Sequence, residues 1–220
     1  MSHFVALVRE QRFVPALAGD ALTSAVHDRS ALRQRLKKLR RAVPPAQRRM
    51  ASLAVAQHIR RTLNLRPGLR IAVYAPLPSE LDTAALVRLG MRHRCRIYLP
   101  RLTDLRRRRM QFVEARGAMR RNHLGIMEPV RLRRLSAHDL DLVFVPLVGF
   151  DAKGMRLGMG AGYYDRAFAF LHQRRYWLHP RLIGLAYSFQ QVPHIEGAPH
   201  DVHLNCVITE KGPIKCNSGC

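Results

Sequence analysis

The chain has 220 residues and a formal net charge of +23, because 38 lysines and arginines stand against 15 aspartates and glutamates. Hydrophobic residues make up 47% and charged residues 24%, which excludes a disordered polyelectrolyte. The length suits one domain with a sizeable core and short appendages. Because so basic a surface attracts polyanions, nucleic acid, a nucleotide and a polyanionic small molecule are all candidate ligands.

The sequence carries the marks of neither a membrane protein nor a disulfide scaffold. No apolar run approaches the roughly 18 residues that a membrane span requires. The apolar residues 4–8 are followed at once by the charged stretch 9–12, so no signal-peptide core is expected. The four cysteines lack a C-x-x-C pair and are predicted to be buried or incidental thiols rather than a disulfide framework. A cytoplasmic protein is therefore expected.

Residues 1–27 show no clear period and are interpreted as an N-terminal extension. After them, apolar residues recur at i, i+4, i+7 and i+11, the spacing of one helix face: Leu32, Leu36, Leu39 and Val43. One border of this stripe, where the helix would meet the body, carries three basic residues: Arg29, Arg33 and Arg40. Pro44 and Pro45 end this helix, and a second one is predicted over residues 46–65.

Short apolar runs alternate with helical patterns along the rest of the chain. Strands are predicted over residues 71–74, 97–99, 110–114, 142–148, 182–186 and 206–208, and helices over residues 82–93 and 163–174. Pro100 is expected to stop the second strand, and Pro146 to end or bulge the fourth, whose continuous hydrophobicity is typical of burial on both faces. This order predicts an α/β fold, a layered domain with a mostly parallel central sheet flanked by helices. The domain would span residues 28–212, and residues 213–220 would form a tail.

The densest chemical signal is the glycine-rich segment 149–165, between the most buried strand and a helix, where α/β sheets bind ligands. Three of its glycines permit positive φ and close backbone approach: Gly158, Gly160 and Gly162. Their N–H groups and the N-terminus of the following helix would form an anion nest. The segment matches neither the Walker A loop nor the dinucleotide-binding fingerprint. The alternative is a flexible glycine turn with Tyr163 and Tyr164 packed in the core.

Charged residues near this segment suit a nucleotide and its metal. Lys153 and Arg156 add positive charge, and Asp165, in the first turn of the following helix, would hold a cation beside a bound phosphate. Asp201 is a second oxygen donor that suits Mg²⁺, although its spacing alone does not place it near Asp165.

Other charged residues allow more than one interpretation. Glu80 follows the first strand, where its carboxylate would bind a polar substrate group or cap the next helix. The arginines on the border of the first helix would bind an anion, or extend their stems past the stripe with their heads in water. The run Arg106–Arg109 is predicted to be a solvated hairpin or loop.

A long motif carries a resemblance to a known family. The stretch Phe150-Asp151-x-x-Gly154-x-Arg156-Leu157-Gly158-x-Gly160-x-Gly162-Tyr163-Tyr164-Asp165 resembles the 5-formyltetrahydrofolate cyclo-ligase family, also called 5,10-methenyltetrahydrofolate synthetase. Further matches follow in the family's order: Arg29-x-x-Leu32-Arg33, Tyr74-x-Pro76, Glu80-x-Asp82-Thr83, Leu99-Pro100-Arg101, Ile183-Gly184-Leu185-Ala186-Tyr187 and His200-Asp201. The resemblance covers about residues 29–212.

The resemblance implies a cyclo-ligase that closes the ring of 5-formyltetrahydrofolate to give 5,10-methenyltetrahydrofolate. This reaction would consume ATP with Mg²⁺, pass through a phosphorylated formyl intermediate and release ADP and phosphate. Arg29 and Arg33 would contact ATP phosphates, which favours the anion-binding interpretation of these two arginines. Glu80 would bind the pterin or formyl end of the folate, and Asp165 and Asp201 would bind Mg²⁺.

The implied ATP cradle is Arg156, Leu157, Gly158, Met159, Gly160, Ala161, Gly162, Tyr163 and Tyr164, with one of the two tyrosines beside the folate. Met159 and Ala161 stand where many members carry basic residues, so a phosphate contact at these positions comes from elsewhere, such as Lys153, or is absent. A monomer with no specific nucleic-acid ligand is expected. The alternatives are a basic nucleic-acid-binding protein and a catalytically inactive nucleotide-binding relative.

Overall fold

The computed structural model describes residues 28–116, 119–121, 127–130, 133–173 and 179–216, so the predicted extension over residues 1–27 lies outside it. Within these ranges, a sheet of eight strands forms the centre of the fold. The strands are, in chain order, β1 (Arg70–Ala72), β2 (Arg96–Asp104), β3 (Arg109–Glu114), β6 (Arg134–Leu135), β7 (Leu142–Pro146), β10 (Arg181–Leu185), β11 (Cys206–Thr209) and β12 (Gly212–Lys215). Their order across the sheet is β12-β11-β10-β7-β1-β2-β3-β6.

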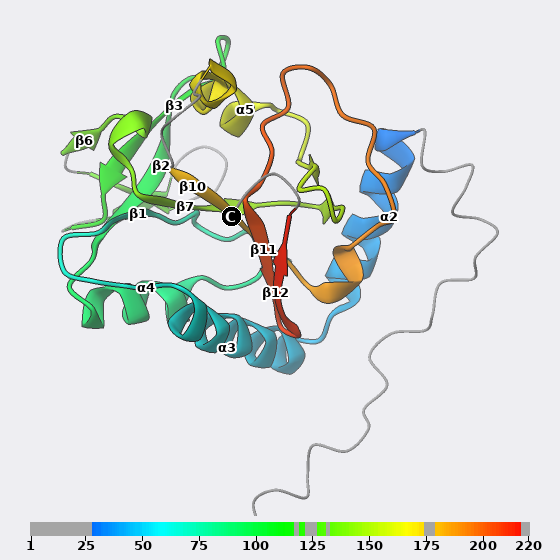
Figure 1. Cartoon of the computed structure of the whole chain (residues 1–220), viewed down its shortest axis with the longest axis horizontal. Coiled ribbons are helices and arrows are strands. Elements are labelled where there is room, and N and C mark those ends of the chain that lie inside the picture. Colours follow the sequence, from blue (N-terminus) through cyan, green and yellow to red (C-terminus); the bar gives the residue numbers. More distant parts are fainter. Residues whose placement is uncertain (1–27, 117–118, 122–126, 131–132, 174–178, 217–220) are drawn as a thin grey trace, which may run out of the picture.

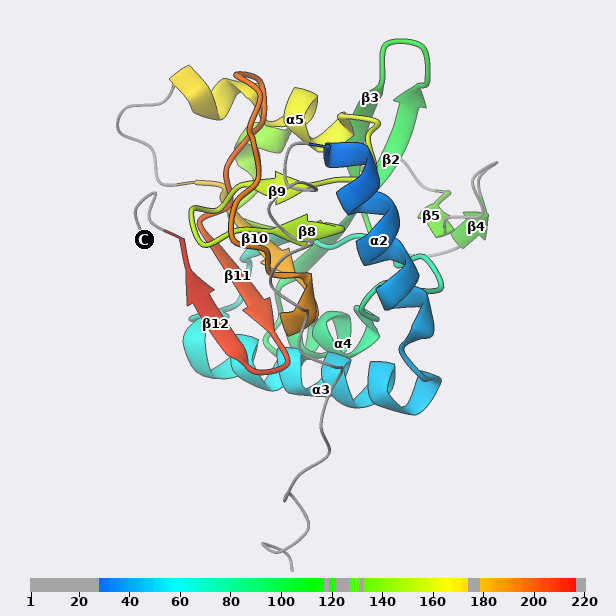
Figure 2. The ribbon, with the colours of Figure 1, turned by 90° about the vertical axis from the view of Figure 1, so that its right-hand side faces the viewer.

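The five central strands β11, β10, β7, β1 and β2 are parallel, whereas β12, β3 and β6 pair antiparallel at the two edges. The helices are α2 (Arg29–Ala42), α3 (Pro45–Thr62), α4 (Ala84–Arg92) and α5 (Tyr163–Ala167), with 3-10 turns η2 (Ala137–Asp139), η3 (Ala169–Gln173) and η4 (Ser188–Gln190). Figures 1 and 2 show α3 and α4 along one face of the sheet and α5 on the other. The predicted α/β class with a mostly parallel sheet is confirmed.

Two small antiparallel pairs lie outside the central sheet: β4 (Met119–Arg121) with β5 (Met127–Pro129), and β8 (Gly149–Phe150) with β9 (Arg156–Leu157). The second pair is a hairpin made by the glycine-rich segment itself. Helix α2 packs against this hairpin, because Leu32 and Leu36 share a buried cluster with Val148, Leu157 and Ile195. The predicted apolar stripe of α2 is therefore confirmed, and Figure 2 shows this helix beside β8 and β9.

The core lies on both faces of the sheet, and β7 contributes to each. Phe144 packs with Val55 and Ile59 of α3 on one face. Val143 and Val145 pack with Phe168 on the other. Successive strand residues point to opposite faces, so a strand between two apolar layers is hydrophobic at every position. Burial of the fourth predicted strand on both faces is confirmed, and the strand ends at Pro146 as expected.

The expectation that Pro100 stops the second strand is wrong, because β2 continues past it. The Tyr98 carbonyl accepts the Val73 N–H at 2.9 Å, and the Ile97 carbonyl accepts the Ala115 N–H at 2.8 Å. Alternate residues of β2 therefore face β1 and β3, and Pro100 faces the side of β1. Since β1 pairs with β2 only as far as Tyr98, no N–H is needed at the proline.

Two predicted boundaries also differ from the structure. The helix over residues 163–174 is split, because α5 ends where the fully buried Phe168 leaves the helical conformation, and η3 follows. The boundary of the tail at residue 213 is wrong, since residues 212–215 form β12 and pair with β11. A frayed tail cannot cover β11, whose residues Cys206–Thr209 are all buried and need a neighbour on that edge.

The thiols follow the sequence prediction. Cys95, Cys206 and Cys216 are buried, while Cys220 lies outside the described residues. No helix in the described part of the chain is both long and apolar enough to cross a bilayer.

Candidate functional site

A buried aspartate shapes the hairpin that leads into the glycines. The Asp151 carboxylate, only 1% exposed, accepts N–H groups from Lys153 at 2.9 Å, Met155 at 3.0 Å and Ile195 at 3.1 Å. A carboxylate that accepts several backbone N–H groups holds its loop in one conformation. Asp151 therefore fixes the β8–β9 turn and ties it to the segment that follows η4.

The residues after β9, 158–162, form what we call the glycine loop. Gly160 and Gly162 have φ angles of +100° and +68°, in the left-handed region that favours glycine. Gly162 is also the N-cap residue of α5. Arg33 of α2 donates from Nε to the Gly158 carbonyl at 2.8 Å, so one predicted phosphate ligand lies directly on the loop. The helix that follows the loop has only five residues, so its dipole adds little to anion binding there.

Arg156 and Asp165 form a partly buried ion pair beside the loop. Arg156 is 5% exposed, and its Nη2 lies 2.6 Å from Asp165 Oδ1. Its Nη1 donates to the Val202 carbonyl, and the Val202 N–H donates to Asp165 Oδ1 at 3.2 Å. These contacts join α5 to the segment around residue 202 and place Asp165 next to Asp201, which the sequence alone does not do.

Asp201 is the partner of the first residue of α2. Arg29 Nη1 lies 2.7 Å from Asp201 Oδ2 and also donates to the Glu196 carbonyl at 3.1 Å. Burial by itself raises the pKa of Asp201, but the hydrogen bonds from Arg29 and the Ala198 N–H outweigh it and lower the pKa. Asp201 is therefore ionised at neutral pH and available to a cation.

The two predicted metal ligands do not form a ready cage. Each has one oxygen engaged by an arginine, Arg156 for Asp165 and Arg29 for Asp201. In the described ranges no group of three or more His, Cys, Asp or Glu side chains is placed to hold a metal ion. Two carboxylates alone suit an ion that takes its remaining ligands from a substrate and from water.

Glu80 forms a second charged centre with Arg40 of α2, which we call the Glu80 centre. Its side chain is buried; Oε2 accepts the Leu77 N–H at 3.0 Å, and Oε1 lies 3.6 Å from Arg40 Nη1. Burial raises the pKa of Glu80, while the Leu77 N–H and the charge of Arg40 act against this rise. The helix-cap alternative does not hold among these contacts, because the first turn of α4 donates to Asp82 instead, at 2.9 Å from the Ala84 N–H.

Tyr164 links the two centres. Burial raises its pKa strongly, the charge of Glu80 raises it further, and Arg156 acts in the opposite direction. The ring also stacks on Phe168 at 6.4 Å between centroids. The pKa of Tyr164 therefore responds to the charge of Glu80 in one centre and to that of Arg156 in the other.

The chain is similar in sequence to known proteins. A sequence profile of the 5-formyltetrahydrofolate cyclo-ligase family matches residues 25–210. The chain belongs to this family. A 5-formyltetrahydrofolate cyclo-ligase of Haemophilus influenzae is 33% identical over 182 residues, which cover 80% of this chain and 94% of the relative. The protein of the same name from Escherichia coli K12 is 29% identical over 184 residues, which cover 79% of this chain and 96% of the relative.

The fold is shared as well. The NMR structure of the 5,10-methenyltetrahydrofolate synthetase of Aquifex aeolicus superposes with a TM-score of 0.73 at 27% identity, covering 87% of this chain and 94% of that one. A 5,10-methenyltetrahydrofolate synthetase from Mycoplasma pneumoniae gives a TM-score of 0.66 at 25% identity and covers 83% of this chain and 99% of that one. The resemblance inferred from the motif is thus confirmed, and with it the assignment to an enzyme family of ligases.

As a member of the cyclo-ligase family, the chain carries side chains that sequence analysis did not assign. Arg40, 3% exposed, supports Glu80 and donates to the Leu147 carbonyl at 3.1 Å and to Ser79 Oγ at 3.2 Å. Its place on the border of the α2 stripe was the only signal. Arg108 and Arg166 both donate to the Ala161 carbonyl of the glycine loop, at 3.3 Å each. Periodicity gives no signal for Arg108, because that contact spans 53 residues.

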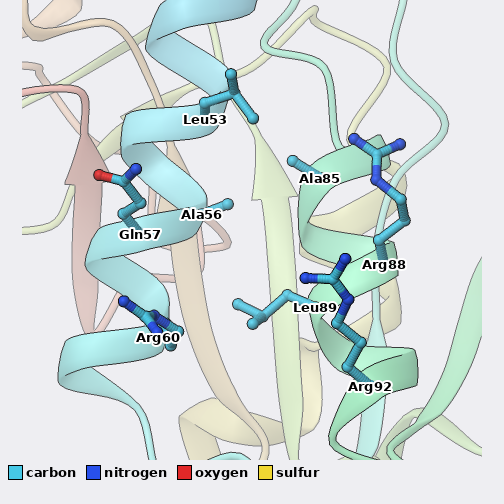
Figure 3. Close-up of a pocket in the computed structure, with 8 residues that line it drawn as sticks. All are labelled: Leu53, Ala56, Gln57, Arg60, Ala85, Arg88, Leu89 and Arg92. Carbon is cyan, nitrogen blue, oxygen red and sulfur yellow. The ribbon is translucent and has the colours of Figure 1, made fainter.

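A second basic region lies away from this site, between α3 and α4. It is an open groove of about 380 Å³, and Figure 3 shows Leu53, Ala56 and Leu89 between the two helices with arginines beside them. Its lining is Leu53, Ala56, Gln57, Arg60, Ala85, Arg88, Leu89 and Arg92. Because α3 and α4 cover the face of the sheet opposite α5, this groove is separate from the glycine loop (Figure 1).

Proposed function

We propose that this chain catalyses the ATP- and Mg²⁺-dependent cyclisation of 5-formyltetrahydrofolate to 5,10-methenyltetrahydrofolate, with release of ADP and phosphate. Membership of the family supports the folate substrate. One observation carries the ATP-dependent part: α2 meets the glycine loop through Arg33, while Arg29 pairs with Asp201 beside the Arg156–Asp165 pair. Cations and carboxylates from distant parts of the chain thus lie at the glycine loop or beside the helix that follows it, as a triphosphate and its metal require.

The proposed reaction has two steps that balance in atoms and charge. The formyl oxygen attacks the γ-phosphorus of ATP, and the bond from that phosphorus to the ADP oxygen breaks. N10 of the folate then attacks the formyl carbon, loses its proton to solvent, and phosphate leaves with the former formyl oxygen. Phosphoryl transfer depends mainly on positioning and charge neutralisation. In this proposal Arg29 and Arg33 position the phosphates and neutralise their charge.

The folate end would lie at the second centre. An ionised Glu80 accepts hydrogen bonds from the N–H groups of a pterin ring, and Arg40 keeps this buried carboxylate charged and oriented. Tyr164, whose pKa responds to the charges of both Glu80 and Arg156, would pack beside the folate where the formyl group meets the phosphate. This choice between the two tyrosines is part of the proposal.

The residues present fit a Mg²⁺ ion that arrives with the nucleotide. Asp165 and Asp201 are hard oxygen donors on adjacent segments, and Mg²⁺ commonly takes one or two protein carboxylates together with phosphate oxygens and water. Asp165 and Asp201 would hold the ion, which supplies charge neutralisation at the phosphates when bound. Arg29 and Arg156 hold the two carboxylates in place before the nucleotide arrives.

The test is direct. Purified protein is mixed with 5-formyltetrahydrofolate, ATP and Mg²⁺, and the near-ultraviolet absorbance of the methenyl product is followed alongside ADP release. One ADP per product is expected, with no product when ATP or Mg²⁺ is omitted. Arg33→Ala tests the loop contact, and Arg88→Ala, on the opposite face, is the matched control. A folded protein that forms no ATP-dependent product would contradict the proposal.

The same preparation tests the two remaining expectations, a monomer and the absence of a specific nucleic-acid ligand. Sedimentation at working concentration should give the mass of one chain. Binding to DNA or RNA should be lost at physiological salt, because unspecific contacts to phosphates weaken steeply as salt rises. Binding that persists at that salt would support the nucleic-acid alternative instead.

A further inference from the structure

The turn between β2 and β3 reaches the glycine loop. Arg108, the last residue of this turn, donates from Nη1 to the Ala161 carbonyl at 3.3 Å. Figure 2 shows the hairpin rising on the same side of the molecule as α5 and the first turn of α2. A turn that sequence analysis predicts to be merely solvated is therefore in contact with the proposed nucleotide site.

The turn is built so that its two neighbouring arginines differ. Asp104 Oδ1 accepts the Arg107 N–H at 2.8 Å, and Asp104 Oδ2 lies 3.9 Å from the Arg107 guanidinium. The Arg107 side chain thus lies against Asp104 of its own hairpin. Arg108 has a φ of +52°, a left-handed conformation that is unfavourable for a residue other than glycine. The turn holds an arginine where glycine or asparagine is favoured, and directs its side chain to the loop.

Two further arginines contact the same loop from other elements. Arg166 of α5 donates to the carbonyls of Ala161 at 3.3 Å and Gly162 at 3.4 Å. Arg33 of α2 donates to the Gly158 carbonyl at 2.8 Å. We call Arg33, Arg108 and Arg166 the arginine collar. Three separate elements thus place one guanidinium each on a loop of five residues.

The collar arginines differ from the other arginines of the site because they have no carboxylate partner among the described residues. Arg29 pairs with Asp201 and Arg156 with Asp165, whereas the collar arginines pair with no carboxylate among the described residues. Their contacts are to neutral carbonyls, which are weaker acceptors than anionic oxygens. A guanidinium has five N–H donors, and each collar arginine uses only one group toward the loop. The collar therefore offers three uncompensated charges and unused donors at one place.

We propose that Arg108 and Arg166 bind the triphosphate of ATP together with Arg33, so that the β2–β3 hairpin forms one wall of the nucleotide site. This inference rests on the proposed function, and it adds residues that neither the motif nor the family match assigns. The ligand chemistry is an anionic oxygen, for which a folate substrate has a second source in its glutamate carboxylates. The triphosphate is favoured because all three contacts converge on the glycine loop and none on the Glu80 centre.

The hairpin supplies a matched pair of variants, Arg108→Ala and Arg107→Ala. Binding is measured by calorimetry at fixed salt with the non-hydrolysable β,γ-imido analogue of ATP and with AMP. In Arg108→Ala the Kd of the ATP analogue should rise about tenfold, the effect of one charge-assisted hydrogen bond, while the Kd of AMP changes less than about twofold. Arg107→Ala should leave both values within about twofold, and Arg108→Lys should restore part of the loss. Arg166→Gln should match Arg108→Ala.

Each other outcome is informative. An unchanged Kd for the ATP analogue in both Arg108→Ala and Arg166→Gln overturns the proposal, and so does an equal loss for AMP. A rise in KM confined to 5-formyltetrahydrofolate with added glutamates assigns the collar to carboxylates and also overturns it. If the unaltered protein binds no ATP analogue, the proposed function itself fails, which is a different result. Far-ultraviolet circular dichroism and thermal unfolding establish that each variant is folded.

Discussion

The arginine collar and the α3–α4 groove each contain three arginines, but these arginines are held differently. In the collar, each guanidinium donates to a carbonyl of the glycine loop. In the groove, Arg60, Arg88 and Arg92 make no hydrogen bond or ion pair with any residue in the described part of the chain. All three arginines are exposed, so their heads remain in water.

The difference shows what net charge can and cannot indicate. A charge of +23 attracts polyanions everywhere on the surface. A binding site additionally needs charges that are already held in position, because an arginine that is free in water loses rotamer entropy when it binds. By this criterion the collar is a site, and the groove is basic surface. The predictions below test this distinction, beginning with the largest expected effect.

Removing the half-buried Asp165 carboxylate beside the loop should have the largest effect. Asp165→Ala leaves the buried Arg156 without its partner, so unfolding free energy in urea should fall by about 3 kcal/mol, and turnover should be lost. Asp104→Ala breaks an exposed pair with Arg107 and should cost less than about 1 kcal/mol. Equal stabilities of the two variants would show that the Arg156–Asp165 pair is not structural.

Loss of one collar arginine should weaken nucleotide binding and leave the fold intact. Arg33→Ala removes a donor at the glycine loop, so the Kd for the ATP analogue should rise tenfold or more. The KM for 5-formyltetrahydrofolate should change less, since Arg33 does not contact Glu80. Calorimetry and steady-state kinetics measure the two quantities. A larger change in the folate KM than in the ATP analogue Kd would place Arg33 at the other substrate.

A pH profile should reveal the role of Arg40. Burial raises the pKa of Glu80, and Arg40 opposes this rise by favouring the ionised form. If ionised Glu80 binds folate, kcat/KM falls as the pH drops through this pKa. In Arg40→Met the pKa rises further, so the acid limb should move to higher pH. Arg41→Met, at an exposed position one residue on, should leave the limb where it is, and an unmoved limb in Arg40→Met would remove Arg40 from this role.

Changes in the groove should have the smallest effect. The triple variant Arg60→Ala, Arg88→Ala and Arg92→Ala removes as many charges as deletion of the whole collar. These side chains make no hydrogen bond or ion pair with the described residues. The Kd for the ATP analogue should therefore stay within about twofold at physiological salt. A tenfold loss would show that long-range charge, rather than fixed contacts, governs nucleotide binding, and would remove the distinction between the two regions.

Local patterns were sufficient to predict the parts of the fold that depend on hydrophobic spacing. The stripe from Leu32 to Val43 predicted α2, and the continuous run at Leu142 predicted a strand buried on both faces. Pro100 was misjudged because the cost of a missing N–H depends on where the neighbouring strand ends. β12 was missed because its burial pattern depends on β11 beside it.

The candidate site shows the same division. The motif from Phe150 to Asp165 predicted the family, and its spacing placed the glycines correctly between strand and helix. The adjacency of Asp165 and Asp201 was not predictable, since it depends on a hydrogen bond from the Val202 N–H. The contact of Arg108 with Ala161 was hidden for a similar reason: an arginine run gives no indication of which side chain turns inward.

The packing of α2 has a consequence for the order in which the protein is made. Leu32 and Leu36 are covered by Val148, Leu157 and Ile195, which are synthesised much later. At ribosomal speed, roughly 10 to 30 seconds separate the synthesis of α2 from that of Ile195. During this interval the growing chain exposes an apolar helix of the kind that chaperones protect. The helix that is made first among the described elements is thus covered only late in synthesis, and the proposed nucleotide site forms only when nearly the whole chain has left the ribosome.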